Sequence, residues 1–170
     1  MTLLPEPFIE TATDTMSDFD LIQVLLIGSL LAVLVWSSVE DLRHRLIPHS
    51  AVAMIAGLYI IYAVAGYADP ISGLISGSIF LVIGFVLFSL NLLGGGDAKM
   101  MAAVALWAGL DSAVPLVFYT TLAGGVVALG TLIVQRIRMQ DSGVAQEAVV
   151  TVPYGVAIAA GGSMVALQAA

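Results

Sequence analysis

The sequence predicts an all-α protein: a polytopic integral membrane helix bundle of about six transmembrane segments, of which the fourth is short. Of 170 residues, 60% are hydrophobic and only 10% are charged, against roughly 25% charged residues in soluble domains. The mean hydropathy is +1.06, and the apolar residues gather in runs of the length that membrane helices need. These observations exclude a soluble globular protein.

The apolar runs follow an acidic N-terminal segment. Residues 1–20 contain no Lys or Arg and so lack the basic start of a secretory signal. We therefore expect an acidic tail over 1–20 and a membrane-embedded domain over 21–170. The runs cover 21–38, 51–66, 71–93, 100–110, 112–134 and 149–170. The fourth, at about eleven residues, is too short to span a bilayer when straight and alone.

The positions of the cations predict the orientation of the bundle. With six segments, all five Lys and Arg residues fall on one side: Arg43, Arg45, Lys99, Arg136 and Arg138. By the positive-inside rule this side is cytoplasmic, and the N-terminal tail, both termini, Asp69 and Asp111 face outward. Without the fourth segment the last two arginines would lie across the membrane from the first two, so the charges support the count of six.

The composition also excludes several classes of chemistry. The chain has no cysteine, which excludes disulfides, thiolate nucleophiles, iron–sulfur clusters and cysteine zinc sites. Its net charge of −7 argues against nucleic-acid binding, because Lys and Arg make most phosphate contacts. We expect no cofactor and, despite His44 and His49, no metal, since the sequence has no H-E-x-x-H motif.

Two aspartates are candidate catalytic residues. Asp41 ends the first apolar run and Asp97 follows three glycines, and both lie on the cytoplasmic side of the predicted topology. A carboxylate near lipid is a functional candidate by default, and two that meet share a proton, as aspartyl hydrolysis requires. The residues alone leave a second reading open, in which both are ordinary interfacial loop residues.

Helix ends suggest how such a pair divides its roles. Asp41 would follow the C-terminal end of a helix, which disfavours a carboxylate, and would hold the shared proton. Asp97 would precede the N-terminal end of the next helix, which favours an anion, and would act as the base. The nearby Arg43 and Arg45 oppose this assignment.

Other residues are predicted to shape the site. Gly94, Gly95 and Gly96 would leave no side chain between the site and an incoming peptide backbone. Lys99 could have a functional role, in which it stabilises an ionised Asp97 or contacts substrate. In the alternative reading it only marks the cytoplasmic end of a helix. Pro153, Tyr154 and Gly155 would shape the entry of the last helix, and the tyrosine hydroxyl is a hydrogen-bond donor.

Read together, three segments resemble the type IV prepilin peptidase family, which are membrane aspartyl proteases with a Gly-x-Gly-Asp motif. They are DLRHRLIP at 41–48, GGGDAK at 94–99 and VPYGVAIAAG at 152–161. The resemblance implies that Asp41 and Asp97 are the catalytic pair of a membrane-embedded peptidase domain in a bacterial inner membrane. It also implies a prepilin-like substrate, cut after a basic leader at the cytoplasmic edge of its hydrophobic helix. His49 departs from the asparagine expected after Ile-Pro.

The absence of cysteines and of a cytoplasmic N-terminal portion makes the chain similar to small, peptidase-only members that serve tight-adherence (Flp-type) pili. Two alternatives remain open. One is a small proton- or ion-coupled transporter, in which the aspartates line an ion pathway. The other is a non-catalytic pilus or secretion assembly subunit that holds partner helices on its glycine-rich faces.

Overall fold

The computed structural model describes residues 6–142 and 153–168, which form six α-helices and no strand. The predicted all-α bundle is therefore confirmed, and so is its short fourth helix, which has 14 residues. The helices are α1 (Glu6–His44), α2 (His49–Val64), α3 (Pro70–Ser89), α4 (Gly95–Ala108), α5 (Ala113–Ser142) and α6 (Tyr154–Gln168).

Three helices are long and apolar enough to cross a membrane: Leu21–His44 within α1, α3, and Ala113–Val134 within α5. Helices α2 and α6 are shorter and also apolar. On α3 and α5, large apolar side chains such as Phe85 and Val126 are each 65% exposed. Such surfaces suit a lipid environment, because lipid chains are as apolar as the side chains they cover.

Two helix starts differ from the sequence-based prediction. The backbone is helical from Glu6, so residues 6–20 continue into the membrane part of α1 without a break, and residues 1–5 lie outside the described residues. Helix α4 begins at Gly95 rather than near residue 100. This earlier start places Asp97 inside the first turn of a helix instead of in a preceding loop.

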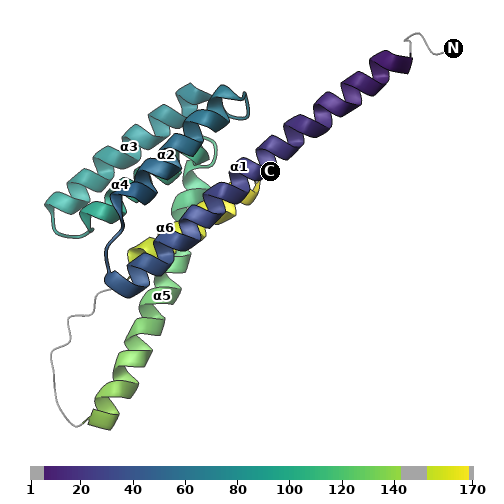
Figure 1. The fold of residues 1–170 in the computed structure, drawn as a ribbon. Helices are drawn as coiled ribbons and strands as arrows, with labels where there is room; N and C mark the ends of the chain where they lie inside the picture. The colour runs from purple at the N-terminus through teal and green to yellow at the C-terminus, as the bar shows by residue number, and fades with distance from the viewer. Residues whose placement is uncertain (1–5, 143–152, 169–170) are drawn as a thin grey trace.

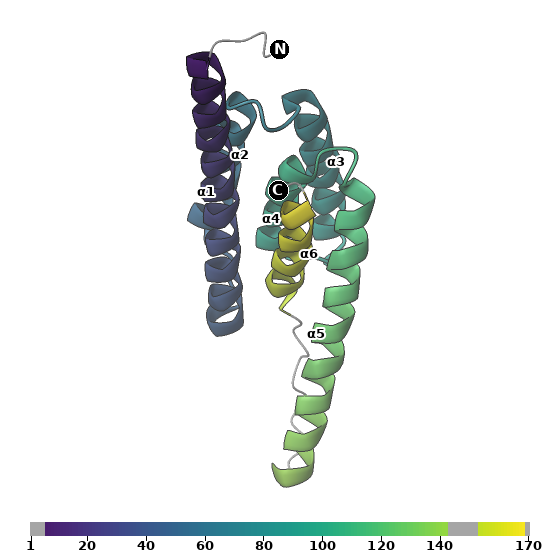
Figure 2. The same cartoon turned by 90° about the vertical axis from the view of Figure 1, so that its right-hand side faces the viewer.

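Successive helices run in alternating directions (Figures 1 and 2). The α1–α2 loop, the α3–α4 loop and the C-terminal end of α5 therefore lie toward one end of the bundle, with Arg43, Arg45, Lys99 and Arg136. The α2–α3 and α4–α5 connections, with Asp69 and Asp111, lie toward the other end.

Helix α4 occupies the interior and packs against α2, α3 and α6. Glycines let its neighbours approach closely. A Cβ added at Gly84 of α3 would lie 2.9 Å from the Ala98 Cβ, and one at Gly162 of α6 would lie 2.7 Å from the Val104 Cγ1. Because these distances are too short for real carbon atoms, α3 and α6 reach α4 only with glycine at these positions.

Aromatic side chains tie α2 to the far end of α4. The Trp107 Nε1–H donates to the backbone oxygen of Ile55 at 3.0 Å, and the Tyr62 and Trp107 ring centroids are 4.8 Å apart. These contacts anchor the C-terminal half of α4, so its N-terminal turn is held at a defined place at the opposite end.

The alternating directions make the membrane orientation testable with a chain that contains no native cysteine. We expect single cysteines at His44 or Arg136 to be protected from an impermeant thiol reagent in intact cells. Cysteines at Ala65 or Asp111, which are also exposed, should be labelled, because the positive-inside rule puts the cationic end in the cytoplasm. Labelling of position 44 or 136 from outside would contradict this orientation.

Candidate active site

Asp41 lies in the last turn of α1 and points into the protein. Its side chain is only 5% exposed, and its Oδ2 accepts a hydrogen bond of 2.9 Å from the backbone N–H of Gly155. A further backbone hydrogen bond comes from Val156. Both donors belong to the first turn of α6, where N–H groups have no partner within the helix. The carboxylate of Asp41 thus caps the N-terminus of α6 from a distant part of the chain.

Asp97 stands at the third position of α4, behind Gly94 as the N-cap residue. Its carboxylate forms a hydrogen bond with the backbone of Gly94, as the acidic residue of a capping box does. The Ala98 N–H donates to the Gly94 oxygen at 3.0 Å, which closes the first helical turn. The local sequence therefore fixes the direction in which the Asp97 side chain leaves the helix.

Asp41 and Asp97 line the same cavity, of about 340 Å³, at the cationic end of the bundle. Their charges interact across it. Two carboxylates in a partly buried site do not readily ionise together, so the pair favours a state with one shared proton. One group is then available to accept a proton and the other to donate one.

Pro153 and Tyr154 also line this cavity. Pro153 is buried and precedes α6, while Tyr154 is 43% exposed and opens that helix. The phenol thus lies at the accessible side of the cavity.

The glycines of the site make room for the two carboxyl groups and for neighbouring side chains. A Cβ at Gly94 would lie 2.6 Å from the Asp97 Oδ2, and one at Gly155 would lie 2.8 Å from the Asp41 Oδ2. At Gly95 it would meet the Phe88 ring at 3.3 Å, and at Gly96 the Ile47 side chain at 3.2 Å. Because Gly94 has no side chain, the Asp97 carboxylate can lie against the start of α4. Because Gly155 has none, the Asp41 carboxylate can lie against the start of α6.

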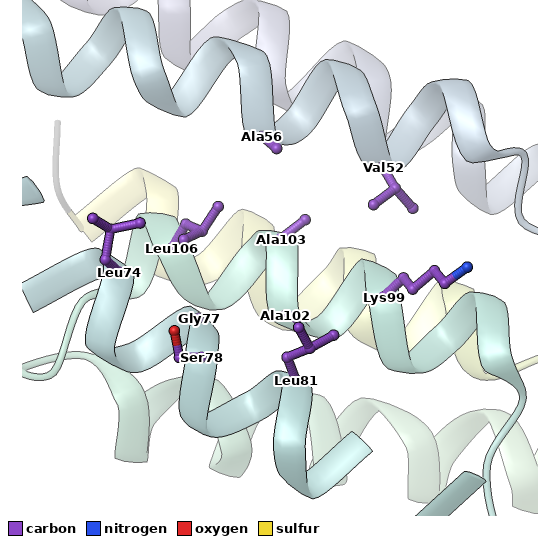
Figure 3. Close-up of a pocket in the computed structure, with 10 residues that line it drawn as sticks. All are labelled: Val52, Ala56, Leu74, Gly77, Ser78, Leu81, Lys99, Ala102, Ala103 and Leu106. Atoms are coloured by element: carbon purple, nitrogen blue, oxygen red, sulfur yellow. The ribbon is translucent and has the colours of Figure 1, made fainter. Parts of the chain in front are cut away.

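Lys99 lies apart from the aspartates. It is exposed and lines a second cavity between α2, α3 and α4, where Figure 3 shows its side chain beside Val52. Two residues along a helix turn the side-chain direction by about 200°. Asp97 and Lys99 therefore face opposite sides of α4.

Part of the cavity wall was not predicted from the sequence. The end of α3 and the following loop contribute Phe88, Asn91, Leu92 and Leu93, and Arg45 contributes from the end of α1. Arg45 and Asn91 have φ values of 53° and 56°; Arg45 directly follows α1, and Asn91 follows Leu90, the C-cap residue of α3. Asn tolerates this left-handed conformation after a helix, so Asn91 could have been predicted to end α3 in this way. Nothing in the sequence indicates a positive φ at Arg45.

The histidines do not join the aspartates. His44 pairs with Glu40 through an Nε2–Oε2 distance of 3.6 Å on the surface of α1, and neither His44 nor His49 lines the cavity. Among the side chains that the structure describes, from residue 21 to 134, at 136 and 137, and from 153 to 168, no three His, Asp or Glu residues are grouped so as to hold a metal ion.

The fold and the site define a helical membrane protein with two interacting carboxyl groups at one end of its bundle. A model of the type IV leader peptidase family matches residues 28–129, more than half of the chain and a range that contains both aspartates. The chain therefore belongs to the type IV leader peptidase family. Comparisons with curated proteins and with solved structures give no match.

The dependence of activity on the space left by the glycines beside the aspartates can be tested by substitution. Gly94→Ala and Gly155→Ala should each reduce peptidase activity by about 100-fold, because displacing a catalytic group by about 1 Å has an effect of that size. The matched control is Gly125→Ala, since a Cβ at this helical position meets nothing within 4 Å. Activity is measured at equal amounts of membrane-inserted protein. Full activity in both site variants would show that the aspartates do not depend on this fit.

Proposed function

We propose that the chain is an aspartyl endopeptidase that removes the leader peptide of prepilin-like precursors, with Asp41 and Asp97 as its catalytic pair. The observation that carries the proposal is that these two residues, from α1 and α4, line one cavity and interact there. Membership of the type IV leader peptidase family supports it.

The site is proposed to lie at the cytoplasmic face of a bacterial inner membrane. Its cavity lies at the end of the bundle that carries Arg43, Arg45 and Lys99, which the positive-inside rule puts in the cytoplasm. A precursor with a basic leader and a hydrophobic helix would have its leader on that same side. The bond between leader and helix would then reach the aspartates without crossing the membrane.

The structure alters the roles expected for the two aspartates. Asp41 was expected to follow the end of the first helix and to hold the proton. Instead it lies within α1 and faces the N-terminus of α6, where Gly155 and Val156 both donate to it. Hydrogen bonds from backbone N–H groups favour the ionised carboxylate. We therefore assign the base to Asp41 and the acid to Asp97, which has one such bond, from Gly94.

Hydrolysis then follows from the positions of the pair. The Asp41 carboxylate takes a proton from water while the water oxygen attacks the scissile carbonyl carbon, and Asp97 gives its proton to the carbonyl oxygen. In the resulting tetrahedral intermediate, Asp41 passes its proton to the leaving nitrogen and the C–N bond breaks. Asp97 recovers its proton from the hydroxyl group, which restores both residues and releases the leader acid and the new amine.

The two alternative functions make different demands on the aspartates. Carboxylates of a transporter pathway usually lie near the bilayer midplane, whereas Asp41 and Asp97 are in the last turn of α1 and the first turn of α4. A non-catalytic assembly subunit would need neither carboxylate for its contacts. The similarity to small members that serve tight-adherence pili makes a short pilin precursor the first substrate to test.

Substitution of either aspartate tests the proposal directly. Asp41→Asn and Asp97→Asn should each lower leader cleavage by about 10³-fold or more, because an amide neither accepts nor donates the required proton. Cleavage is followed as a gel shift of co-expressed precursor. Asp111→Asn, an exposed acid at the opposite end of the bundle, serves as the control and should leave cleavage unchanged. Near-normal cleavage by either site variant would remove the aspartyl mechanism.

The assignment of roles predicts a bell-shaped dependence of cleavage on pH, with the acid limb set by ionisation of the base. Gly155→Ala disturbs the hydrogen bond to Asp41, so the acid limb of its residual activity should move up by about one pH unit, since 1.36 kcal/mol corresponds to one unit. The profile of Gly125→Ala should match that of the unchanged protein. If only the alkaline limb moves in Gly155→Ala, the roles are the reverse.

A further inference from the structure

A second cavity, of about 280 Å³, opens between α2 and α3, and α4 forms its floor (Figure 3). Val52 and Ala56 line it from α2, and Gly77 and Leu81 from α3. Helices α2 and α3 both pack on α4 but make little contact with each other. The result is an apolar groove, called here the α2–α3 groove.

The floor of the α2–α3 groove suits a helix. Ala102 and Ala103 of α4, together with Gly77, present small side chains, and small residues let helix backbones approach closely in lipid. From Lys99 to Leu106 the floor extends about 10 Å at 1.5 Å per residue, or two helical turns. The groove is thus long enough for about two turns of a further helix packed beside α4.

Lys99 gives the groove a single charged group at one end. It is the fifth residue of α4, two residues after Asp97, and is the one charged residue of the lining. The ion pair between Glu40 and His44 does not involve Lys99, and no described side chain forms an ion pair with Lys99. A cation at the edge of an apolar groove favours a ligand that brings a carboxylate.

A comparable groove without a charge lies elsewhere on the bundle. Between α5 and α6, a cavity of about 330 Å³ is lined by Tyr119 and by apolar residues that include Leu122 and Val126. It has no charged residue. Of these two grooves, the α2–α3 groove alone combines an apolar lining with a cation, which lies two residues after Asp97 on α4.

We propose that the α2–α3 groove docks the hydrophobic helix of the precursor, and that Lys99 forms an ion pair with an acidic side chain near the cytoplasmic end of that helix. The inference rests on the proposed function, because it supplies the position from which the leader reaches the aspartates. The precursor helix lies on one side of α4, and its extended N-terminal part passes the end of α4 to the cavity on the other side.

Site-specific photo-crosslinking tests the location. A photoreactive amino acid is placed at Leu74 of the α2–α3 groove or at Leu122 of the α5–α6 groove, two leucines with exposed fractions of 59% and 58%. The full chain carries Asp41→Asn so that bound precursor is not cleaved. We expect precursor adducts from position 74 and none from position 122. Adducts from 122 alone, or only lipid adducts from 74, would overturn the proposal.

Charge exchange tests the role of Lys99. In a series of precursors, a single Glu occupies successive positions of the first three turns of the hydrophobic helix. Lys99→Glu should raise KM about tenfold with little change in kcat, and only for precursors whose Glu lies on one helical face, at spacings of three or four residues. Lys at the same precursor position should restore KM for Lys99→Glu, and Lys99→Arg, which keeps the cation, should retain the preference for precursors with Glu on that helical face.

The outcomes separate this inference from the proposed function. If KM rises equally for every precursor and charge exchange restores nothing, Lys99 contributes only to membrane anchoring and the ion pair is excluded. Leader cleavage that is lost in Asp41→Asn and Asp97→Asn would still support the aspartyl peptidase. If those variants cleave normally, the proposed function fails whatever the crosslinks show.

Discussion

The close approach of three helices to α4 is the constraint on which the rest of the structure depends. A 14-residue helix has too few turns to be held by large interdigitating side chains alone. Its neighbours meet it through alanine and glycine, at Gly84 and Ala98 on one side and at Gly162 and Val104 on another. In lipid, where no hydrophobic effect drives helices together, such close van der Waals packing supplies much of the association energy.

This packing determines where the two carboxyl groups meet. Helix α6 contacts both α1 and α4, and the Gly155 N–H holds the Asp41 carboxylate at 2.9 Å. The same α6 fits against Val104, about two turns further along α4 than Asp97, at about 3.6 residues per turn. A single short helix thus aligns the end of α1 with the start of α4, and the relative position of the aspartates follows from helix packing rather than from loop conformation.

Hydropathy and charge were sufficient to predict the helical bundle, because both are local properties of each segment. The short motifs around Asp41 and Asp97 were sufficient to identify the family, and they single out the two residues proposed as its catalytic pair. The start of α4 could not be predicted in the same way. Glycine is a poor helix former, so Gly94-Gly95-Gly96 indicates a loop, whereas packing against Ile47 and Phe88 makes Gly95 and Gly96 the first helical residues.

That difference of a few residues changes the geometry of the site. Because Asp97 belongs to a helix, Lys99 must face another side of that helix. Asp97 therefore lines the cavity with Asp41, and Lys99 lines the α2–α3 groove. The contact of Asp41 with Gly155 and the wall built from Phe88 and Asn91 join distant parts of the chain. No periodicity or motif within one segment carries such information, since it depends on how the helices pack.

The length of α4 also bears on how water, the second substrate of peptide hydrolysis, reaches the carboxyl pair. At 1.5 Å per residue a 14-residue helix spans about 21 Å, against roughly 30 Å of hydrocarbon. A helix of this length that is centred in the bilayer would end below the level of the surrounding lipid headgroups. The polar surface must dip toward such an end, and a bilayer accommodates a short segment by thinning locally. The recess above Asp97 would therefore hydrate the carboxyl pair while the scissile bond stays beside the hydrocarbon.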